Sequence, residues 1–450
     1  MKYDAIIIGF GKAGKTLAGF LAKRGEKVAL VERSKEMYGG TCINVGCIPS
    51  KSLVNSAAEA ALHQEESFEE KSARYAAAIE EKRRVTGFLR GKNYDKLNSL
   101  PNVTIYDGFG HFISGTKVAV ELTAGGSEEL EAEKIFINTG AQPRLPNIPG
   151  IEGNSAAYIS ETLLDEPVLP RRLTLIGAGY ISMEFASMYS SFGSKVTVIQ
   201  DGAVFLPKED RDVAEAIMNI MQKRGVEFLI GAKPLAIEGG DVRYEKDGGE
   251  YVLKGDGVLL ATGRAANTRG LDAEKAGVTL TSRGAVEVDD LLRTSAPGIW
   301  ALGDVNGGPQ FTFVSLDDYR IAASQLTGGD YSRSGRKNLP YSVFMDTPLA
   351  RVGITEAQAQ EKGLPVRVLK LPVAAVPKAQ VLKKTDGFLK AIVHEKTGKI
   401  LGAALLCPEA YELINVIKLA MDMDGDYTVL RDEIYTHPTM TEAFNDLFAL

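Results

Sequence analysis

The chain has 450 residues, 44% of them hydrophobic and 24% charged, with a formal net charge of −6 at pH 7. This is an ordinary globular composition, and the length predicts two to four domains if about 100–200 residues make one. No basic cluster indicates a nucleic-acid partner, and no apolar run is long enough for a membrane helix. The three cysteines make no disulfide framework, and the first strand starts too early to leave room for a signal peptide. We therefore expect a cytoplasmic protein that contacts neither membrane nor nucleic acid.

The N-terminal residues predict a dinucleotide-binding unit. The expected elements are a strand over 3–8, a glycine turn over 9–14, a helix to about residue 24 and a strand over 27–31. The turn has the G-x-G-x-x-G pattern in its strand–turn–helix setting. Gly9 permits the tight turn, Gly11 lets the backbone approach a pyrophosphate, and Gly14 lets the helix pack closely on the strand. Glu32 ends the second strand, where a carboxylate would accept hydrogen bonds from a ribose.

Residues 9–16 also fit a second pattern, G-x-x-x-x-G-K-T, which is the phosphate loop of ATP- and GTP-hydrolysing proteins. The pattern alone does not separate the two interpretations. Gly11 at the second glycine position and Glu32 at the ribose position favour the dinucleotide unit. The cysteine pair that follows has no role in a nucleotide hydrolase.

Residues 39–51 read Gly-Gly-Thr-Cys-Ile-Asn-Val-Gly-Cys-Ile-Pro-Ser-Lys and contain two of the three cysteines. Cys42 and Cys47, placed beside a nucleotide site, predict redox chemistry; the alternative is two small buried residues in a glycine-rich loop. A helix turns about 100° per residue, so positions five apart do not face each other. A disulfide between them requires a distorted backbone, which makes it easier to reduce. Cys407 follows an apolar run and is expected to be a core thiol.

The glycine pattern recurs 168 residues later (177 − 9 = 168). A strand over 173–176 leads into Gly177-Ala178-Gly179-Tyr180-Ile181-Ser182, then a helix to residue 192 and a strand over 195–199. Ser182 replaces the third glycine and is still small. Two such patterns in register predict two dinucleotide sites in one chain.

Gln200 stands 23 residues after Gly177, as Glu32 does after Gly9. A carboxylate at this position would bind the 2′-hydroxyl of NADH and repel the 2′-phosphate of NADPH, whereas an amide repels phosphate much less. No arginine follows within residues 201–207 to bind that phosphate. We expect NADH as the preferred cofactor, with NADPH possible; alternatively, Asp201 supplies the acidic group.

Two matching strand–turn segments are expected to close the two nucleotide units. The first ends in Thr139 and Gly140, and the second in Gly263. A further apolar strand runs into Gly303-Asp304. Residues 340–450 predict a mixed α/β domain with strands over 341–345, 366–373, 388–394 and 400–406.

His437 lies five residues before Glu442 in the segment Thr-His-Pro-Thr-Met-Thr-Glu, and the chain has only four histidines. Histidine titrates near neutral pH, so it can hold a thiol as thiolate and protonate a leaving group. Although a lone histidine is more often structural, the cysteine pair favours a catalytic role for His437.

Residues 39–51 resemble the active-site motif of the class I pyridine nucleotide-disulfide oxidoreductases, a flavoprotein family. The resemblance implies an α/β fold with two Rossmann-like domains, one for FAD and one for NAD, and a C-terminal α+β dimerisation domain, arranged as in glutathione reductase. The expected boundaries are 1–150 and 270–335 for the FAD domain, 151–269 for the NAD(P) domain and 340–450 for the dimerisation domain.

The resemblance also implies roles for individual residues. Cys47 would lie against the flavin and exchange electrons with it, while Cys42 would be the interchange thiol on the substrate side. Lys51 matches a lysine whose ammonium sits near flavin N5, and Glu184 matches the acid that pairs with that lysine. In a homodimer, His437 would reach across to Cys42 of the other copy.

Glu442 would orient that histidine, and Asp304 would bind the ribityl hydroxyls of the flavin. The expected FAD-binding residues are Gly9, Gly11, Gly14, Glu32, Gly40, Thr41, Lys51, Thr139, Gly140, Gly303 and Asp304. The expected NAD-binding residues are Gly177, Gly179, Ile181, Glu184, Gln200 and Gly263. No resident metal is expected.

Within this family the chain is similar to bacterial hypothiocyanous acid reductases, also described as reactive-chlorine-resistance flavoproteins. Residues 9–16, 37–42, 310–320 and 371–375 carry that similarity. It implies that electrons pass from NADH through FAD and the cysteine pair to hypothiocyanous acid, a small oxidant that is reduced to thiocyanate.

Other activities of the family stay open. They are a dihydrolipoamide dehydrogenase, a glutathione-type disulfide reductase and a copper(II) or mercuric ion reductase; a non-enzymatic nucleotide-binding protein is a further alternative. Tyr435 stands where dihydrolipoamide dehydrogenases usually have a second histidine, and residues 445–450 lack the cysteine pair of mercuric reductases. The second nucleotide site lacks the arginine set of glutathione reductase.

Overall fold

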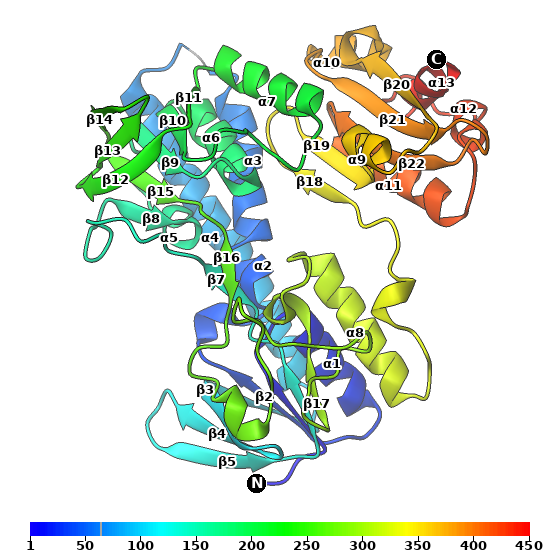
Figure 1. The fold of residues 1–450 in the computed structure, drawn as a ribbon. Helices are drawn as coiled ribbons and strands as arrows, with labels where there is room; N and C mark the ends of the chain where they lie inside the picture. Colours follow the sequence, from blue (N-terminus) through cyan, green and yellow to red (C-terminus); the bar gives the residue numbers. More distant parts are fainter. Residues whose placement is uncertain (64) are drawn as a thin grey trace. The chain divides into compact units, whose positions relative to one another are not determined.

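The computed structural model describes residues 1–63 and 65–450, which form two compact units. Unit 1 consists of Met1–Ser52, Ala78–Leu145 and Gly263–Arg336. Unit 2 consists of Leu53–Ala77, Pro146–Thr262 and Lys337–Leu450. The colours of Figure 1 show that each unit gathers segments far apart in the sequence. The four-part division at residues 150, 269 and 335 stays a prediction.

Unit 1 is built on a seven-stranded sheet (Figure 1). Its strands, in spatial order, are β17 (Ile299–Ala301), β6 (Lys134–Ile137), β1 (Ala5–Ile8), β2 (Val28–Glu32), β3 (Val103–Ser114), β4 (Lys117–Leu122) and β5 (Ser127–Glu131). The first five are parallel and the last two antiparallel. A parallel strand is covered on both faces, which is why β1 is apolar throughout. Ile7 packs into a core shared with helix α1 (Lys12–Lys23), whereas Ile6 faces a second core on the other side.

The remaining elements of unit 1 are short or cross between the units. Strands β7 (Ala141–Pro143) and β16 (Arg264–Ala266) form a two-stranded ladder. The helices are α2 (Thr41–Asn44), α3 (Cys47–Ala60), α4 (Phe68–Asn98) and α8 (Thr312–Leu326), with 3-10 turns η1 (Lys35–Met37), η2 (Ala273–Ala276), η3 (Gly303–Asn306) and η4 (Arg333–Gly335). Helices α3 and α4 start in one unit and end in the other, and α8 packs on α1.

Unit 2 contains the second predicted nucleotide unit. Its parallel sheet runs in the order β11 (Glu227–Ile230), β10 (Lys195–Gln200), β9 (Arg172–Ile176), β15 (Gly257–Leu260) and β8 (Ala157–Ile159). An antiparallel sheet consists of β12 (Lys233–Glu238), β13 (Asp241–Lys246) and β14 (Gly249–Leu253). The helices are α5 (Ser160–Leu163), α6 (Tyr180–Phe192) and α7 (Arg211–Lys223). Helix α6 packs on β9 and β10, as the repeated glycine pattern predicts.

The C-terminal residues of unit 2 form a five-stranded antiparallel sheet. Its order is β18 (Tyr341–Val343), β19 (Leu349–Gly353), β22 (Ile400–Leu406), β21 (Phe388–His394) and β20 (Val366–Pro372). The helices are α9 (Glu356–Glu361), α10 (Pro377–Leu382), α11 (Ala410–Asp422), α12 (Thr428–Arg431) and α13 (Ala443–Ala449), with the 3-10 turn η5 (Val373–Ala375). The four strands predicted here are present. Strand β19 was not predicted from the sequence, and it carries Arg351 at its centre.

Cys407 follows β22 and is fully buried in the core of this sheet, as predicted for a core thiol. Burial raises its pKa well above the usual range. A buried thiol of this kind is chemically inert. The candidate redox thiols are therefore the two other cysteines.

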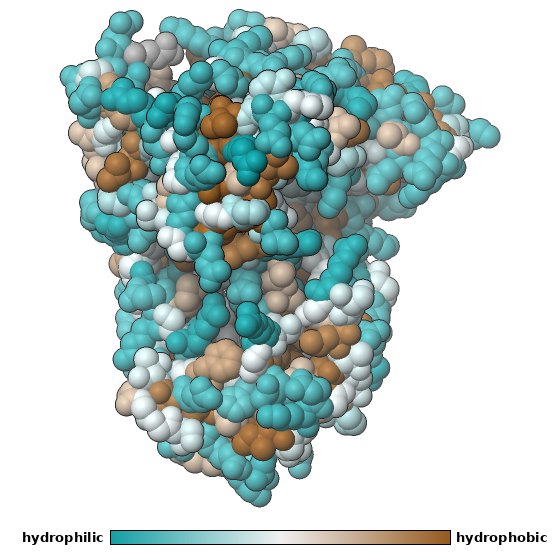
Figure 2. All heavy atoms as spheres, turned by 60° about the vertical axis from the view of Figure 1, so that its left-hand side comes forward, coloured by the Kyte–Doolittle hydropathy of each residue, from teal (hydrophilic) through white to brown (hydrophobic). Residues whose placement is uncertain are grey.

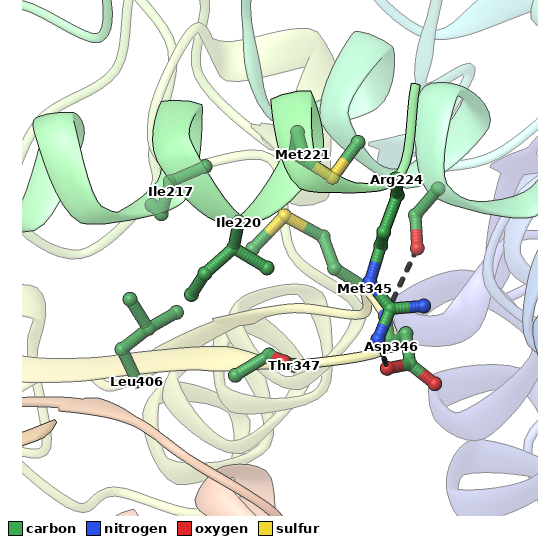
Figure 3. Close-up of a pocket in the computed structure, with 9 residues that line it drawn as sticks. Ile217, Ile220, Met221, Arg224, Met345, Asp346, Thr347 and Leu406 are labelled. Carbon is green, nitrogen blue, oxygen red and sulfur yellow. Dashed lines mark hydrogen bonds and ion pairs between the residues drawn. The ribbon is translucent and has the colours of Figure 1, made fainter. Parts of the chain in front are cut away.

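Helix α7 is joined to the C-terminal sheet by apolar and ionic contacts. In Figure 3 Ile220 and Met221 of α7 lie near Met345, and Arg224 pairs with Asp346. The pocket between these side chains is too narrow to hold a ligand, so it is a packing feature of the joint.

A buried lysine forms a second tie between α7 and the C-terminal sheet. Lys390 of β21 is only 1% exposed, and its ammonium lies 3.1 Å from Asp210, 3.0 Å from Asp212 and 2.7 Å from Glu356. Asp210 also accepts the backbone N–H groups of Glu356 and Ala357 at the start of α9. A buried charge needs such partners, because leaving it unpaired is costly.

The face in Figure 2 is largely hydrophilic, with small hydrophobic patches. Among the described residues, no helix is both long enough and apolar enough to cross a membrane.

Candidate redox and dinucleotide sites

The first glycine turn is shaped by close backbone approaches. A Cβ at Gly9 would lie 2.3 Å from the carbonyl oxygen of Asn138, and the φ of Gly9 is +108°. A Cβ at Gly11 would lie 2.6 Å from Oδ1 of Asn138, and one at Gly14 would lie 2.6 Å from the carbonyl oxygen of Gly9. All three predicted glycines are therefore required by packing at the start of α1.

Asn138 organises this turn, although it is not among the site residues predicted from the sequence. The residue follows β6 and is 5% exposed. Its Oδ1 accepts the N–H of Gly14 at 2.9 Å, and its Nδ2 donates to the carbonyl oxygen of Leu302 at 2.6 Å. The sequence feature that could have indicated this role is a polar residue directly after a buried parallel strand.

Glu32 lies at the end of β2, as predicted, and is 7% exposed. Its carboxylate accepts the N–H of Phe10 at 3.0 Å and that of Ser34 at 3.3 Å. Burial raises the pKa of Glu32 against the opposing effect of these backbone bonds. The carboxylate is thus held beside the glycine turn, where a ribose hydroxyl could donate to it.

The segment with Gly303 and Asp304 meets the same turn. A Cβ at Gly303 would lie 2.8 Å from Oγ of Ser315, and that hydroxyl accepts the N–H of Ala13 in the first turn of α1. Asp304 lies in η3, and burial raises the pKa of its carboxyl. The glycine cradle, Glu32 and Asp304 fit an FAD molecule.

A buried acid supports this segment. Asp318 is 1% exposed and accepts the N–H of Gly303 at 2.7 Å and Nδ2 of Asn306 at 3.2 Å. Arg336 pairs with Asp318 and, at 2.8 Å, with Asp317. Residues 310–320 carried the family similarity in the sequence, but this role of Asp318 was not predicted.

Thr139 and Gly140 follow Asn138 at the start of the β7–β16 ladder. Oγ1 of Thr139 donates to the carbonyl oxygen of Asn267 at 2.7 Å, and the N–H of Asn267 donates to the carbonyl oxygen of Gly140 at 2.9 Å. Both residues therefore belong to the same side of unit 1 as the glycine turn. Their contact with FAD stays a prediction.

The predicted redox segment folds against the first glycine turn. A Cβ at Gly40 would lie 2.7 Å from the Cα of Gly11, so the two turns touch. Thr41 begins α2, which carries Cys42, and Cys47 begins α3.

The two cysteines of this segment are free thiols, Cys42 half-buried and Cys47 exposed. A hydrogen bond with Cys47, together with burial, raises the pKa of Cys42 well above its usual range, and a bond from Thr312 acts in the opposite direction. Sγ of Cys47 lies 3.4 Å from Oγ1 of Thr312. The two thiols and this hydroxyl thus form one cluster.

Lys51 lies in α3, and its ammonium donates to Oγ of Ser50 at 3.3 Å. Glu184 lies in α6 and accepts the N–H of Phe344 at 2.9 Å. Lys51 belongs to unit 1 and Glu184 to unit 2. Their pairing stays a prediction.

The second glycine turn repeats the geometry of the first. The φ of Gly177 is +98°, and a Cβ there would lie 2.7 Å from the carbonyl oxygen of Ala261. Ser182, at the third position, bonds through Oγ to the carbonyl oxygen of Gly177. The hydroxyl therefore stays inside the turn, which explains how serine replaces glycine. A Cβ at Gly179 would meet no atom within 4 Å, which leaves space above the turn.

Gln200 ends β10 at the predicted position. Its Nε2 donates to the carbonyl oxygens of Gly202 and Val204, both at 2.8 Å. The amide thus orders the loop after β10. Ile181 lies half-buried in the first turn of α6, and Gly263 begins the third segment of unit 1. Their contacts with NAD stay predictions.

A polar cluster around Glu209, beside the second glycine turn, was also not predicted from the sequence. Glu209 accepts hydrogen bonds from the hydroxyls of Tyr180 and Tyr341, and Arg351 pairs with it at 3.2 Å. Because Tyr180 begins α6 whereas Tyr341 and Arg351 lie in the C-terminal sheet, the carboxylate of Glu209 links the second glycine turn to that sheet.

His437 and Glu442 come together as predicted. Nδ1 of His437 lies 2.7 Å from Oε2 of Glu442, and Oε1 of the same carboxylate accepts the N–H of Thr439 at 3.3 Å. The His437 side chain is 70% exposed, against 17% for Glu442. The acid is thus fixed by its loop and orients an imidazole that is open to solvent.

Comparisons with known proteins agree with this geometry. Residues 3–318 match the family model of the pyridine nucleotide-disulphide oxidoreductases, and residues 339–448 match that of their dimerisation domain. The chain is 48% identical to the probable pyridine nucleotide-disulfide oxidoreductase RclA of Escherichia coli (strain K12), over 100% of this chain and 99% of the relative. It is 34% identical to dihydrolipoyl dehydrogenase of Mycobacterium tuberculosis (99% and 97%) and 32% identical to mercuric reductase of Acidithiobacillus ferrooxidans (97% and 80%).

Solved structures give the same result. The HOCl-induced flavoprotein disulfide reductase RclA from Escherichia coli matches with a TM-score of 0.92 and 48% identity, over 100% of both chains. Its Cu(II) complex matches with a TM-score of 0.93, over 100% of this chain and 99% of the other. The family uses pyridine nucleotides, and membership implies FAD and NAD(P)H as cofactors. The chain belongs to the pyridine nucleotide-disulphide oxidoreductases, as the cysteine motif and the two glycine turns predicted, and it is not a nucleotide hydrolase.

Proposed function

We propose that the chain uses NADH to reduce hypothiocyanous acid to thiocyanate in defence against oxidants, in the reducing cytoplasm. The observation that carries this proposal is the cluster of Cys42, Cys47 and Thr312 against the first glycine turn. The similarity to RclA over the whole chain supports a role in defence against oxidants, because the solved RclA is described as HOCl-induced.

The cysteines carry the reaction. FAD, which the first glycine turn, Glu32 and Asp304 would hold, would supply the two electrons and the one proton taken from NADH. With these the Cys42–Cys47 disulfide opens to the Cys42 thiol and the Cys47 thiolate. The Cys42 thiolate attacks the sulfur of hypothiocyanous acid, so that a new S–S bond forms and the S–O bond breaks. The departing hydroxide takes a proton from His437 and leaves as water. The Cys47 thiolate then attacks Sγ of Cys42, restores the disulfide and expels thiocyanate with the electron pair of the broken S–S bond.

His437 is proposed to act on Cys42 of a second copy. It is exposed in the chain, it is oriented by Glu442, and it lies within the residues that match the dimerisation domain. A neutral imidazole accepts the proton of the Cys42 thiol and later donates it to the leaving hydroxide. The active enzyme is therefore a homodimer.

NADH is proposed over NADPH. Gln200 is uncharged and bonded to its own loop, and no arginine occurs in residues 201–207 to bind a 2′-phosphate. Asp201 is the alternative acidic group. Glu184 and Ile181, which lie in the same unit as Gln200, are proposed to line this site.

Reduction of Cu(II) is a second candidate, because RclA has been solved as a Cu(II) complex. Two thiols suit Cu(I), the soft ion that this reduction would form. Among the described residues, no group of three or more His, Cys, Asp or Glu side chains could hold a resident metal ion, so copper would be a substrate.

The test compares NADH and NADPH oxidation by the purified yellow protein with hypothiocyanous acid, lipoamide, oxidised glutathione and Cu(II). We expect fast turnover with hypothiocyanous acid and NADH, and slow turnover with lipoamide and glutathione. Fast turnover with lipoamide would instead make the chain a dihydrolipoamide dehydrogenase.

A further inference from the structure

Lys15, in the first turn of α1, has no role in the proposed function. It created the resemblance to a phosphate loop, yet its ammonium binds protein oxygens. Nζ donates to the carbonyl oxygen of Gly39 at 3.2 Å and to Oδ1 of Asn93 at 2.7 Å. Gly39 lies three residues before Cys42, and Asn93 lies in α4. One cation therefore ties α1 and α4 to the redox segment.

The contacts around this ammonium hold it in place. Nδ2 of Asn93 donates to the carbonyl oxygen of Leu89 at 2.7 Å, so the amide is oriented with Oδ1 toward Lys15. Gly39 packs tightly here, since a Cβ on it would lie 2.8 Å from Cδ1 of Ile43 and 3.4 Å from Cγ of Asn93. The redox segment cannot move away from α4 without breaking these contacts.

The positive charge of Lys15 affects the pKa of Cys42. A hydrogen bond with Cys47 and burial raise the pKa of Cys42 above its usual range, whereas the bond from Thr312 and the positive charge of Lys15 lower it. The thiolate is the nucleophile, so a group that favours the thiolate raises the reactivity of Cys42. Lys15 thus supplies positive charge that favours this thiolate.

We propose that Lys15 is a positioning residue of the redox centre, which anchors the Gly39 turn and supplies the counter-charge for the Cys42 thiolate. The significance of that charge for turnover rests on the proposed function, in which Cys42 attacks the oxidant. The electrostatic effect itself is a property of the reduced protein and does not depend on the acceptor.

The effect depends on pH. Burial, followed by the charge of Lys12, lowers the pKa of Lys15 to about 8. The groups that face its ammonium are Lys12 on α1, Lys96 on α4 and Cys42 on α2. Lys15 is therefore charged at neutral pH, and its help to the Cys42 thiolate fades as the pH rises through about 8.

The test is the alkylation rate of Cys42 by iodoacetamide in the reduced holoenzyme between pH 6 and pH 10, read by tandem mass spectrometry. Lys15→Gln keeps a hydrogen-bond donor but removes the charge, and Lys15→Arg keeps the charge. Lys23→Gln is the matched control, because Lys23 is an exposed lysine at the end of the same helix. At pH 7 we expect Lys15→Gln to slow alkylation about tenfold, since one pKa unit corresponds to a tenfold change in thiolate. Lys23→Gln is expected to match the wild type.

Equal rates in Lys15→Gln and the wild type would overturn the inference. If Lys15→Gln does not fold, Lys15→Arg decides, because arginine stays charged above pH 8. We expect this variant to alkylate faster than the wild type at pH 9, and identical pH profiles would contradict the role of the charge. Failure of the wild type to reduce hypothiocyanous acid would reject the proposed function and leave the alkylation result standing.

Discussion

The backbone N–H of Gly14 donates a hydrogen bond of 2.9 Å to Oδ1 of Asn138, which lies 124 residues further along the chain. Nδ2 of the Asn138 side chain donates a second hydrogen bond, to the carbonyl oxygen of Leu302. Leu302 follows β17 and directly precedes Gly303 and Asp304. One buried side chain thus joins the three segments from which the FAD site is expected to form.

Replacing Asn138 with alanine is expected to lower the free energy of unfolding by about 1–3 kcal/mol, because the N–H of Gly14 and the carbonyl of Leu302 lose a buried partner. The protein should also bind FAD weakly. Urea unfolding and the flavin absorbance of the purified protein measure both effects. Asn98→Ala, at the exposed end of α4, serves as a control expected to change stability by less than about 0.5 kcal/mol. A stable, fully yellow Asn138→Ala protein would contradict the role of this side chain.

Glycine-to-alanine changes at two positions of α1 should have opposite results. At Gly14 the new Cβ would lie 2.6 Å from the carbonyl oxygen of Gly9, so we expect loss of FAD or of folding. At Gly19 the nearest atom, Cδ2 of Leu97, is 3.5 Å away. There alanine should stabilise the helix by about 0.5–1 kcal/mol. Thermal unfolding and flavin content are measured for both variants. If Gly14→Ala were as stable and bound as much flavin as Gly19→Ala, the glycine turn would tolerate a side chain at Gly14.

The sequence predicted the features that depend on short patterns. Gly9, Gly14, Gly177 and Cys47 stand where their spacing placed them, because a tight turn or a helix start depends on neighbouring residues. Asn138 could not be found in the same way, since its partners become neighbours only when distant strands pair in the sheet.

The buried ion pairs of Glu209 and Lys390 could not be predicted from the sequence for the same reason. Glu209 and Lys390 look like ordinary surface residues in the sequence, yet both are buried in unit 2. Each is buried because a partner from a different segment neutralises it, as Arg351 does for Glu209. Lys15 shows the converse, since its pattern suggested phosphate binding whereas its partners are Gly39 and Asn93.

Lys390→Met should be strongly destabilising, by about 3–5 kcal/mol, because it leaves the carboxylates of Asp210, Asp212 and Glu356 without their buried counter-ion. Lys370→Gln is the matched control: Lys370 lies beside Lys390 on β20 but is 42% exposed, and it pairs with Asp212 at 2.8 Å. The Lys370→Gln substitution should lower the free energy of unfolding by less than about 1 kcal/mol. Chemical unfolding at pH 7 measures the free energy of unfolding of both variants. A similar loss of stability in the two would contradict the importance given to the burial of Lys390.

The lysine network also predicts a dependence on pH. Burial lowers the pKa of Lys390, but bonds to Glu356, Asp212 and Asp210 outweigh it and raise the pKa above the usual value. A raised lysine pKa gives stability that is fully present below the pKa of the unfolded chain and is lost as the pH rises through that of the folded protein. The stability difference between wild type and Lys390→Met should therefore shrink at high pH. A difference that is constant up to pH 12 would contradict this assignment.

His437→Gln should slow acceptor reduction by about 10²- to 10⁴-fold, because the Cys42 thiol loses its base and the leaving hydroxide its acid. Flavin reduction by NADH should stay fast, since His437 takes no part in it. Stopped-flow absorbance separates the two half-reactions. Thr436→Ala, next to the histidine, is the control, and normal turnover of His437→Gln would exclude the proposed proton transfer.

The most direct test of the account is NADH-dependent reduction of hypothiocyanous acid by wild type, Cys42→Ser and Cys47→Ser proteins. We predict rapid turnover in the wild type and none in Cys42→Ser, although NADH still reduces its flavin. Turnover in Cys42→Ser at the rate of the wild type would show that the acceptor does not react at Cys42.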